Sequence, residues 1–274
     1  MPPAIPRLFV LIAISTALFA PQGAAGQVAP EAAHRSAAST LTPRPFRAAT
    51  ATKPLTGHVV AIDPGHQLGN WTHGRQIARR VNAGGLRKPC NTTGTVTRSG
   101  YKESAFNMSV ANELRTRLVA QGATVHLTRT AESKDLWGPC VDVRGRFAQR
   151  VHADLLVSIH ADGTPSRYHG FFVIRPALRK GVTDNIYKPS GVLAKDIRAG
   201  LQQAGLKRAN YMGGDGLDTR GDMGTLNLSN APAVMVEAGN MKNSTDASHM
   251  QSAAYRDKVY AAGLASGVAA FLKR

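Results

Sequence analysis

The residues best suited to chemistry stand where apolar runs end. His66, His160 and Glu237 each come at or just after the end of a short apolar run rich in β-branched residues. Such runs are typical of buried parallel strands. In open α/β sheets, ligands bind outside the carboxyl ends of the strands, so three such ends predict one shared site.

The residue types at these ends match a hydrolytic zinc site. Such a site needs three protein ligands, an open position for water and a nearby base. His66 and His160 are the candidate nitrogen ligands. Glu103 is the candidate third ligand, because it begins a predicted helix whose dipole tolerates a carboxylate. Glu237 then remains as the candidate base.

Each of the four residues also has an ordinary structural interpretation. In a chain with nine histidines, one histidine is commonly a surface or hydrogen-bonded residue. Glu103 by itself would be a stabilising charge at a helix start. Glu237 is harder to explain structurally, because burying a carboxylate without a partner is costly. The four residues are dispersed in the sequence and form no local signature such as HExxH, so their spacing alone does not distinguish a metal site from these structural roles.

The elements that must position these residues follow from the apolar spacing. Strands are predicted at residues 58–63, 124–128, 155–160, 170–174 and 233–237. Helices are predicted at residues 103–121, 142–151, 191–204 and 253–272. Strands that alternate with helices predict an α/β fold, with a mostly parallel sheet covered by helices on both faces. The whole of residues 57–274 is expected to form one domain.

The N-terminus has the layout of a secretory signal peptide. Arg7 precedes an apolar stretch at residues 8–20, and small residues follow at 23–26. Residues 1–26 are therefore expected to direct export, with an uncleaved interfacial anchor as the alternative. The stretch is too short to span a bilayer, so no stable membrane anchor is expected. Residues 27–56, rich in Ala, Pro, Ser, Thr and Arg, are expected to be a linker.

Because export would place the chain in an oxidising compartment, it determines how the two cysteines are interpreted. An even count in an oxidising compartment favours one disulfide between Cys90 and Cys140, and two reduced buried thiols are the alternative. Cys90 lies in residues 67–100, a stretch without strong periodicity that is long for a loop in a compact domain. Residues 67–100 are expected to form either a lid over the site or a plain surface insertion. Residues 213–224 are also predicted to be a loop.

The charge points to an anionic partner. The formal net charge is +17 and the sequence pI is near 10.6. For an exported protein, anionic wall polymers are the expected partner rather than nucleic acid, and no element interleaves basic with aromatic residues. A solvated basic face without a dedicated partner is the alternative. The candidate contacts are Arg79, Arg80, Arg87, Lys88, Arg144, Arg146 and Arg150.

Four segments together resemble the zinc-dependent N-acetylmuramoyl-L-alanine amidases. They are Val-Ala-Ile-Asp-Pro-Gly-His at residues 60–66, Glu103 at a helix start, Leu-Val-Ser-Ile-His-Ala at 156–161, and Pro-Ala-Val-Met-Val-Glu-Ala-Gly-Asn at 232–240. The resemblance covers residues 57–274. It implies a twisted mixed sheet flanked by helices, one Zn²⁺ per chain held by His66, Glu103 and His160, and Glu237 as the catalytic residue.

The resemblance also implies a substrate. Members of this family hydrolyse the amide bond between N-acetylmuramic acid and the L-alanine of peptidoglycan stem peptides. The chain is therefore expected to be a monomeric exported hydrolase acting on peptidoglycan or muropeptides, in the periplasm, the cell wall or outside the cell. A zinc peptidase cutting within the stem peptide and a non-catalytic envelope-binding protein are the alternatives. Gln67-Leu68 stands where the family usually has Gly-Gly, so the mouth of the site is expected to differ.

Overall fold

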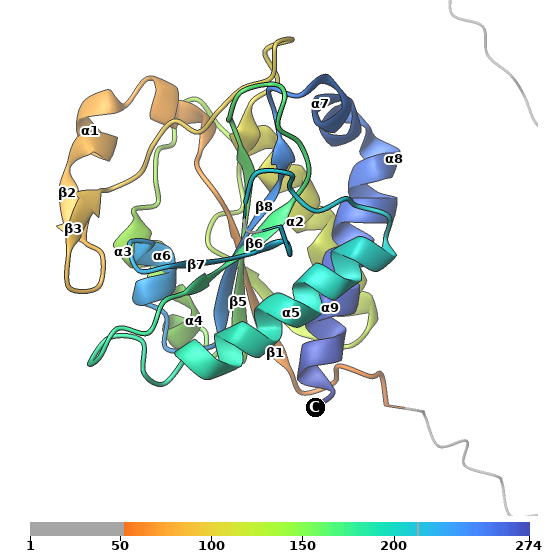
Figure 1. Ribbon diagram of the computed structural model, residues 1–274. Coiled ribbons are helices and arrows are strands. Elements are labelled where there is room, and N and C mark those ends of the chain that lie inside the picture. Colours follow the sequence, from red (N-terminus) through yellow and green to blue (C-terminus); the bar gives the residue numbers. More distant parts are fainter. Residues whose placement is uncertain (1–51, 213) are drawn as a thin grey trace, which may run out of the picture. The chain divides into compact units, whose positions relative to one another are not determined.

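The computed structural model describes residues 52–212 and 214–274. The predicted signal peptide at 1–26 and all but the last residues of the predicted linker at 27–56 therefore lie outside the described residues. A central six-stranded sheet in the order β4-β1-β5-β8-β6-β7 organises the described part (Figure 1). Its strands are β1 (Val59–Pro64), β4 (Thr124–Leu127), β5 (Leu155–Asp162), β6 (Phe172–Pro176), β7 (Leu217–Arg220) and β8 (Ala233–Asn240).

The sheet is mixed but mostly parallel. Strand β1 pairs in parallel with β4 and β5, and β5 pairs in parallel with β8. Strand β6 pairs antiparallel with β8 and in parallel with β7, so these two outer strands run against the other four. The predicted α/β fold with a mostly parallel, mixed sheet is confirmed.

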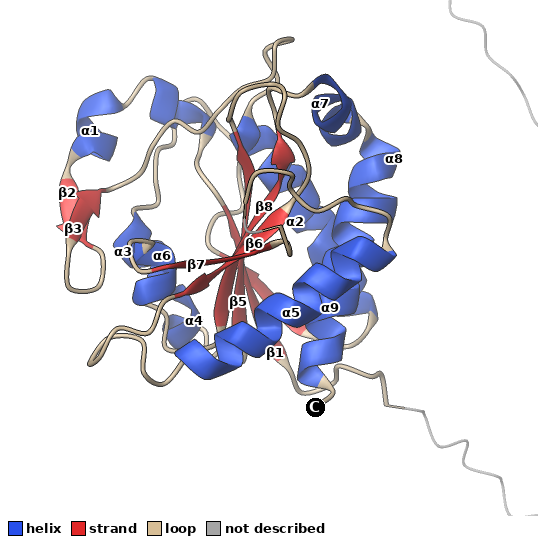
Figure 2. Ribbon diagram, viewed as in Figure 1, coloured by secondary structure: helices blue, strands red, loops and turns tan. Residues whose placement is uncertain are grey.

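Helices cover both faces of the sheet (Figure 2). Helices α2 (Glu103–Ala120), α5 (Tyr187–Gln203) and α9 (Ala262–Leu272), with the π-helical segment η2 (Arg256–Ala261), form one layer. The shorter helices α3 (Val141–Gly145), α4 (Phe147–Arg150) and α6 (Gly224–Asn227) form the other. Within the described residues, no helix combines the length and apolar character needed to cross a bilayer.

Helix α2 shows how the sequence builds the larger layer. Phe106, Val110, Leu114 and Leu118 recur every four residues and are all fully buried against the sheet. This stripe confirms the predicted helix, because side chains four residues apart share one helix face. Gly122, with a φ of 100°, follows the helix end and takes the left-handed conformation that glycine adopts without strain.

Alternation along the strands assigns side chains to the two faces. Ile159 and Val236 belong to the larger apolar cluster, which is packed by α2, α5 and α9. Met235 belongs to the smaller cluster, on the side of α4 and α6. His160 and Glu237 each follow a residue of the larger cluster, so they leave the sheet on the opposite side, near the carboxyl ends of β5 and β8.

Several predicted boundaries were wrong. The single helix predicted at 142–151 is two short helices divided at Arg146, next to Gly145, where α3 packs so tightly on α6 that an added Cβ would lie 2.7 Å from Leu228 Cβ. The predicted strand at 170–174 begins at Phe172, because Gly170 has a φ of 91° and does not extend the strand. Helix α5 begins at Tyr187, four residues before its predicted start at Gly191.

Two stretches predicted as loops contain regular structure. Residues 213–224 include the edge strand β7, whose short polar sequence Leu-Asp-Thr-Arg gave no apolar signal. Residues 67–100 include η1 (Leu68–Trp71), α1 (Gly74–Ala78) and an antiparallel hairpin of β2 (Arg80–Asn82) and β3 (Arg87–Pro89). The helix predicted at 253–272 is found as the consecutive segments α8 (Ala253–Tyr255), η2 and α9, and α7 (Ser244–Gln251) precedes it as an unpredicted helix.

A disulfide joins Cys90, just after β3, to Cys140, just before α3. The predicted bridge is confirmed. It ties the hairpin to the smaller helix layer, and the backbone N–H of Val141 also donates to the Cys90 carbonyl at 2.8 Å. Whether residues 67–100 act as a lid stays a prediction.

Candidate metal centre and catalytic site

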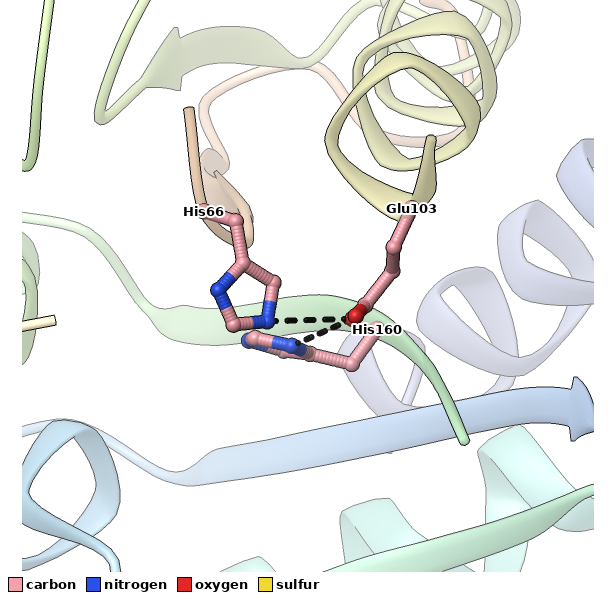
Figure 3. A group of neighbouring side chains, drawn as sticks. All are labelled: His66, Glu103 and His160. Atoms are coloured by element: carbon pink, nitrogen blue, oxygen red, sulfur yellow. Dashed lines mark hydrogen bonds and ion pairs between the residues drawn. The ribbon is translucent and has the colours of Figure 1, made fainter. Parts of the chain in front are cut away.

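Three of the predicted site residues meet in one buried cluster (Figure 3). Glu103 Oε1 lies 3.2 Å from His66 Nε2 and 3.0 Å from His160 Nδ1. One ligand atom from each of the three residues lies within 4.8 Å of the other two. Two imidazoles and a carboxylate at this separation could hold a single metal ion.

The turn after β1 directs His66 into the cluster. His66 has a φ of 60°, a left-handed conformation that is uncommon for a residue with a side chain and that concentrates at functional sites. Its Nδ1 lies 3.0 Å from the Thr92 carbonyl, which can accept a hydrogen bond only from Nδ1–H. This contact fixes the tautomer and leaves Nε2 available as a ligand atom.

Glu103 occupies the first turn of α2 and is held by backbone donors. The Thr95 N–H donates to Oε2 at 2.8 Å, and the Ala161 N–H donates to Oε1 at 3.1 Å. Burial opposes ionisation, but the charge of His66 and hydrogen bonds from His160 and His66 hold the pKa of Glu103 well below its usual range. The carboxylate is therefore ionised, as a metal ligand must be.

His160, on β5, is oriented from both sides. Its Nδ1 faces Glu103, and its Nε2 lies 2.8 Å from Nη2 of Arg144, which can only donate. Burial, the largest effect, lowers the pKa of His160 to about 4. The imidazole is therefore neutral near pH 7, and because Nε2 accepts from Arg144, the proton lies on Nδ1, facing Glu103.

Arg144 is itself fixed by a buried ion pair that the sequence did not reveal. Its Nη2 lies 2.7 Å from Asp63 Oδ2, and both side chains are almost fully buried. Burial opposes ionisation of Asp63, but the charge of Arg144 and hydrogen bonds from Arg144, Ser158 and Thr128 hold the pKa of Asp63 far below its usual range. The prediction that Arg144 contacts wall polymers was wrong, because this side chain is not exposed.

A signal for this pair was present in the sequence. Asp63 is a carboxylate at the end of an apolar strand, as Glu237 is, and such a group needs a buried partner. The sequence offers no way to find which of the many arginines supplies that partner, since Arg144 is 81 residues away.

Two glycines leave the space that the ligands occupy. A Cβ on Gly65 would lie 2.2 Å from Cε1 of the His160 ring. A Cβ on Gly94, which has a φ of 74°, would lie 2.7 Å from Glu103 Oε2 and 2.9 Å from His66 Cδ2. Real Cβ atoms do not approach other atoms this closely, so a side chain at either position would displace the candidate ligands.

Glu237 lies beside the cluster. In the register of β5 and β8 it is the direct partner of His160, so the two side chains leave the sheet next to each other. Burial, followed by the charges of Glu103 and Asp162, raises the pKa of Glu237 well above its usual range. A carboxyl group with a raised pKa can both take up and release a proton near neutral pH.

Two cavities meet at this point. One, of about 290 Å³, extends past Lys88 of the hairpin and Asp222. The other, of about 250 Å³, extends along residues 92–95 to Gly163. His66, His160 and Glu237 line both cavities. A substrate could therefore extend to either side of the cluster, with its reacting bond between the candidate ligands and Glu237.

The chain is similar to known proteins of one family. A family model described as N-acetylmuramoyl-L-alanine amidase matches residues 60–270. The chain is 41% identical over 219 residues to an N-acetylmuramoyl-L-alanine amidase of Mycobacterium tuberculosis, an alignment that covers 80% of this chain and 88% of that protein.

Solved structures extend the similarity to the fold. The crystal structure of the N-acetylmuramyl-L-alanine amidase Ami1 from Mycobacterium smegmatis matches with a TM-score of 0.73 and 37% identity, covering 80% of this chain and 98% of that one. The apo form of Ami1 from Mycobacterium abscessus gives the same TM-score and identity, covering 80% of this chain and 100% of that one.

Proposed function

The chain belongs to the N-acetylmuramoyl-L-alanine amidase family, and we propose that it is an exported zinc hydrolase. Its substrate is the amide bond between N-acetylmuramic acid and the L-alanine of a peptidoglycan stem peptide. Its role is cell-wall remodelling or turnover.

The observation that carries the proposal is the position of Glu237 next to the cluster of His66, Glu103 and His160. The three cluster residues would hold one zinc ion. Two imidazole nitrogens and one ionised carboxylate, with a cavity on either side, are the donor set of a catalytic zinc site. When bound, the ion would supply a Lewis acid that polarises the amide carbonyl and makes water more acidic.

The protein's own groups would move the proton. Glu237 accepts a proton from the attacking water and then donates it to the nitrogen of the leaving L-alanine. Its raised pKa suits both transfers, because the carboxyl group must hold the proton between them. The Thr92 carbonyl and Arg144 orient the two imidazoles during the reaction and take no part in the transfer.

The disulfide supports export. Disulfides persist in oxidising compartments outside the cytosol, and the bridge between Cys90 and Cys140 fits a protein that carries a signal peptide at residues 1–26.

The remaining candidate contacts to anionic wall polymers on the hairpin and on α4 include the exposed Arg80, Arg87 and Arg150. Lys88 is paired with Asp222 at 2.9 Å and is therefore less available.

Product analysis tests the reaction. The purified protein is incubated with defined muropeptides, with and without a chelator, and the products are identified by mass spectrometry. The proposal expects a free muramyl carboxylate and a stem peptide with a new α-amine on L-alanine, with both products lost on chelation and restored by zinc. Cleavage inside the stem peptide would instead show a zinc peptidase, and the absence of any product would indicate an envelope-binding protein.

A further inference from the structure

A third cavity, of about 490 Å³, lies away from the catalytic cluster, between α5 and the outer strands β6 and β7. It is called the α5 groove here. Its lining includes Arg175, Tyr187, Lys188, Gly191, Lys195 and Asp215. Three of these carry positive charges and one carries a negative charge.

Arg175 of β6 is held in one orientation. Its Nε donates to Oγ1 of Thr219, its register partner on β7, at 2.9 Å. Its guanidinium carbon lies 4.9 Å from the centre of the Tyr187 ring, a cation–π contact. Gly191 leaves the space for it, because a Cβ there would lie 2.8 Å from Nη1.

The terminal nitrogens of Arg175 are nevertheless free to bind. None of the described residues forms an ion pair with Arg175 or accepts a hydrogen bond from its Nη1 or Nη2. A guanidinium held by its inner nitrogen presents two parallel donors to an oxyanion at a low entropic cost. Such an arrangement differs from a solvated surface arginine, whose side chain is not fixed.

Two lysines extend the charge along the helix. Lys188 and Lys195 are seven residues apart, so they lie on the same face of α5 with Gly191 between them. Both are exposed, and neither has an ion-pair partner in the described part of the chain. The one acidic lining residue, Asp215, already lies near Arg198, whose Nη1 is 3.9 Å from its Oδ2. The α5 groove therefore keeps an excess of positive charge.

The α5 groove has no part in the catalytic site. Arg175 and Val173 are two residues apart on β6, so their side chains lie on the same face of the sheet. Val173 packs in the larger cluster, on the α5 side. Glu237 pairs with Phe172, which packs on the other side. Arg175 is thus three residues along β6 from the position of Glu237, about 10 Å along the strand, and on the opposite face.

We propose that the α5 groove binds an anionic polymer, with its repeated phosphate or carboxylate groups on Arg175, Lys188 and Lys195. Three cations along one groove match a chain of anions better than a single small anion, because each additional charge adds an attraction. The choice of a wall polymer as the source rests on the proposed function, since an exported wall hydrolase meets such polymers. The binding itself does not require hydrolysis.

A matched pair of variants tests the location. The affinities for inorganic polyphosphate and for polygalacturonate are measured with the full chain by fluorescence anisotropy at two salt concentrations. R175Q/K188Q/K195Q is compared with R115Q/K258Q/K273Q, which loses the same charge from exposed residues on α2, on η2 and just after α9. The proposal expects the groove variant to bind at least one polymer about tenfold more weakly than the control variant does. Equal losses in the two variants would overturn it in favour of diffuse charge.

A charge-neutral variant tests the fixed guanidinium. In Gly191→Ala the new methyl group must displace the end of Arg175, and alanine suits the interior of a helix better than glycine does. We expect weaker polymer binding with unchanged or higher stability. Unchanged binding by Gly191→Ala would reject the role of the positioned guanidinium.

Two further measurements distinguish polymer binding from membrane binding and from hydrolysis. Vesicles of phosphatidylglycerol and phosphatidylcholine serve as a membrane probe, and groove-dependent binding to vesicles without binding to either polymer would overturn the proposal. Turnover of a soluble muropeptide by the unaltered protein is measured in the same preparation. Its absence would reject the proposed hydrolase function and leave the binding comparison intact.

Discussion

His160 and Glu237 are direct partners in the register of the parallel strands β5 and β8. The register therefore places a candidate metal ligand and a candidate base side by side, although the two residues come from distant parts of the chain. His66 and Glu103 complete the cluster from a turn and a helix start. This division of one site among separate elements leads to the following predictions.

Glu237→Gln separates proton transfer from metal binding. The amide side chain keeps the shape of the carboxylate but cannot accept a proton, so the turnover number should fall by about 10²- to 10⁴-fold. Zinc content, measured by mass spectrometry of the metal, should stay at one ion per chain. Glu113→Gln, on the outer part of α2, is the control and should change neither value. Substantial muropeptide hydrolysis by Glu237→Gln would remove Glu237 from its role.

His160→Ala should release the metal. The substitution removes one of three donors and leaves Arg144 without its partner on Nε2. We expect substoichiometric zinc after dialysis, together with loss of hydrolysis. His126→Ala, an exposed histidine on β4, should retain a full complement of zinc. If the His160 variant also kept one tightly bound ion, the ligand set would need revision.

A comparison of two glycines isolates the packing around the ligands. Gly94 and Gly100 have φ values of 74° and 90°, so alanine strains the backbone at either position. A Cβ at Gly94 collides with Glu103 and His66, whereas a Cβ at Gly100 has nothing within 4 Å. Both variants should lose about 1 kcal/mol of unfolding free energy or more. Only Gly94→Ala should also lose zinc affinity, by about 10- to 100-fold in a competition titration; equal affinities would show that the approach of Gly94 does not matter.

The buried pair of Asp63 and Arg144 should contribute to stability in a pH-dependent way. The pKa of Asp63 is lower in the folded protein than in the unfolded chain, so its ionised form stabilises the fold above about pH 4. That stabilisation is lost as the pH falls toward the depressed value. Asp63→Asn should cost about 3–5 kcal/mol at pH 7, because it leaves a buried guanidinium unpaired.

Urea unfolding of the zinc-free protein from pH 7 down to pH 3 measures this effect. The free-energy difference between the original protein and Asp63→Asn should shrink as the pH falls. Asp257→Asn removes an acidic partner from the half-exposed pair with Arg117, and it should cost no more than about 1 kcal/mol. A difference that stayed constant with pH would mean that Asp63 acts through packing rather than charge.

The sequence predicted those parts of the structure that depend on local pattern. The apolar runs before His160 and Glu237 predicted the strands and the shared site at their ends, and the four-residue stripe of α2 predicted the helix that begins at Glu103. These signals are strong because each lies within one element. The same argument explains why β7 was missed: a short edge strand buries little and needs no apolar run.

The parts that could not be predicted depend on pairs distant in sequence. The Thr92 carbonyl that fixes the tautomer of His66 belongs to a loop residue without any motif. Arg144 was one of many arginines, and only the fold shows that it joins Asp63 to His160. Charge alone directed attention to the hairpin. Arg175, which Thr219 holds and which has no ion pair among the described residues, lies on the α5 side of the sheet.

The cluster of His66, Glu103 and His160 draws together the end of one strand, the first turn of a long helix and the end of a second strand. A cation bound there would cross-link three segments that are otherwise held together by the hydrophobic core. Because such a cation would bind only the folded chain, the melting temperature should rise with the concentration of free metal. Metal supply would then govern how long the folded enzyme persists as well as its rate.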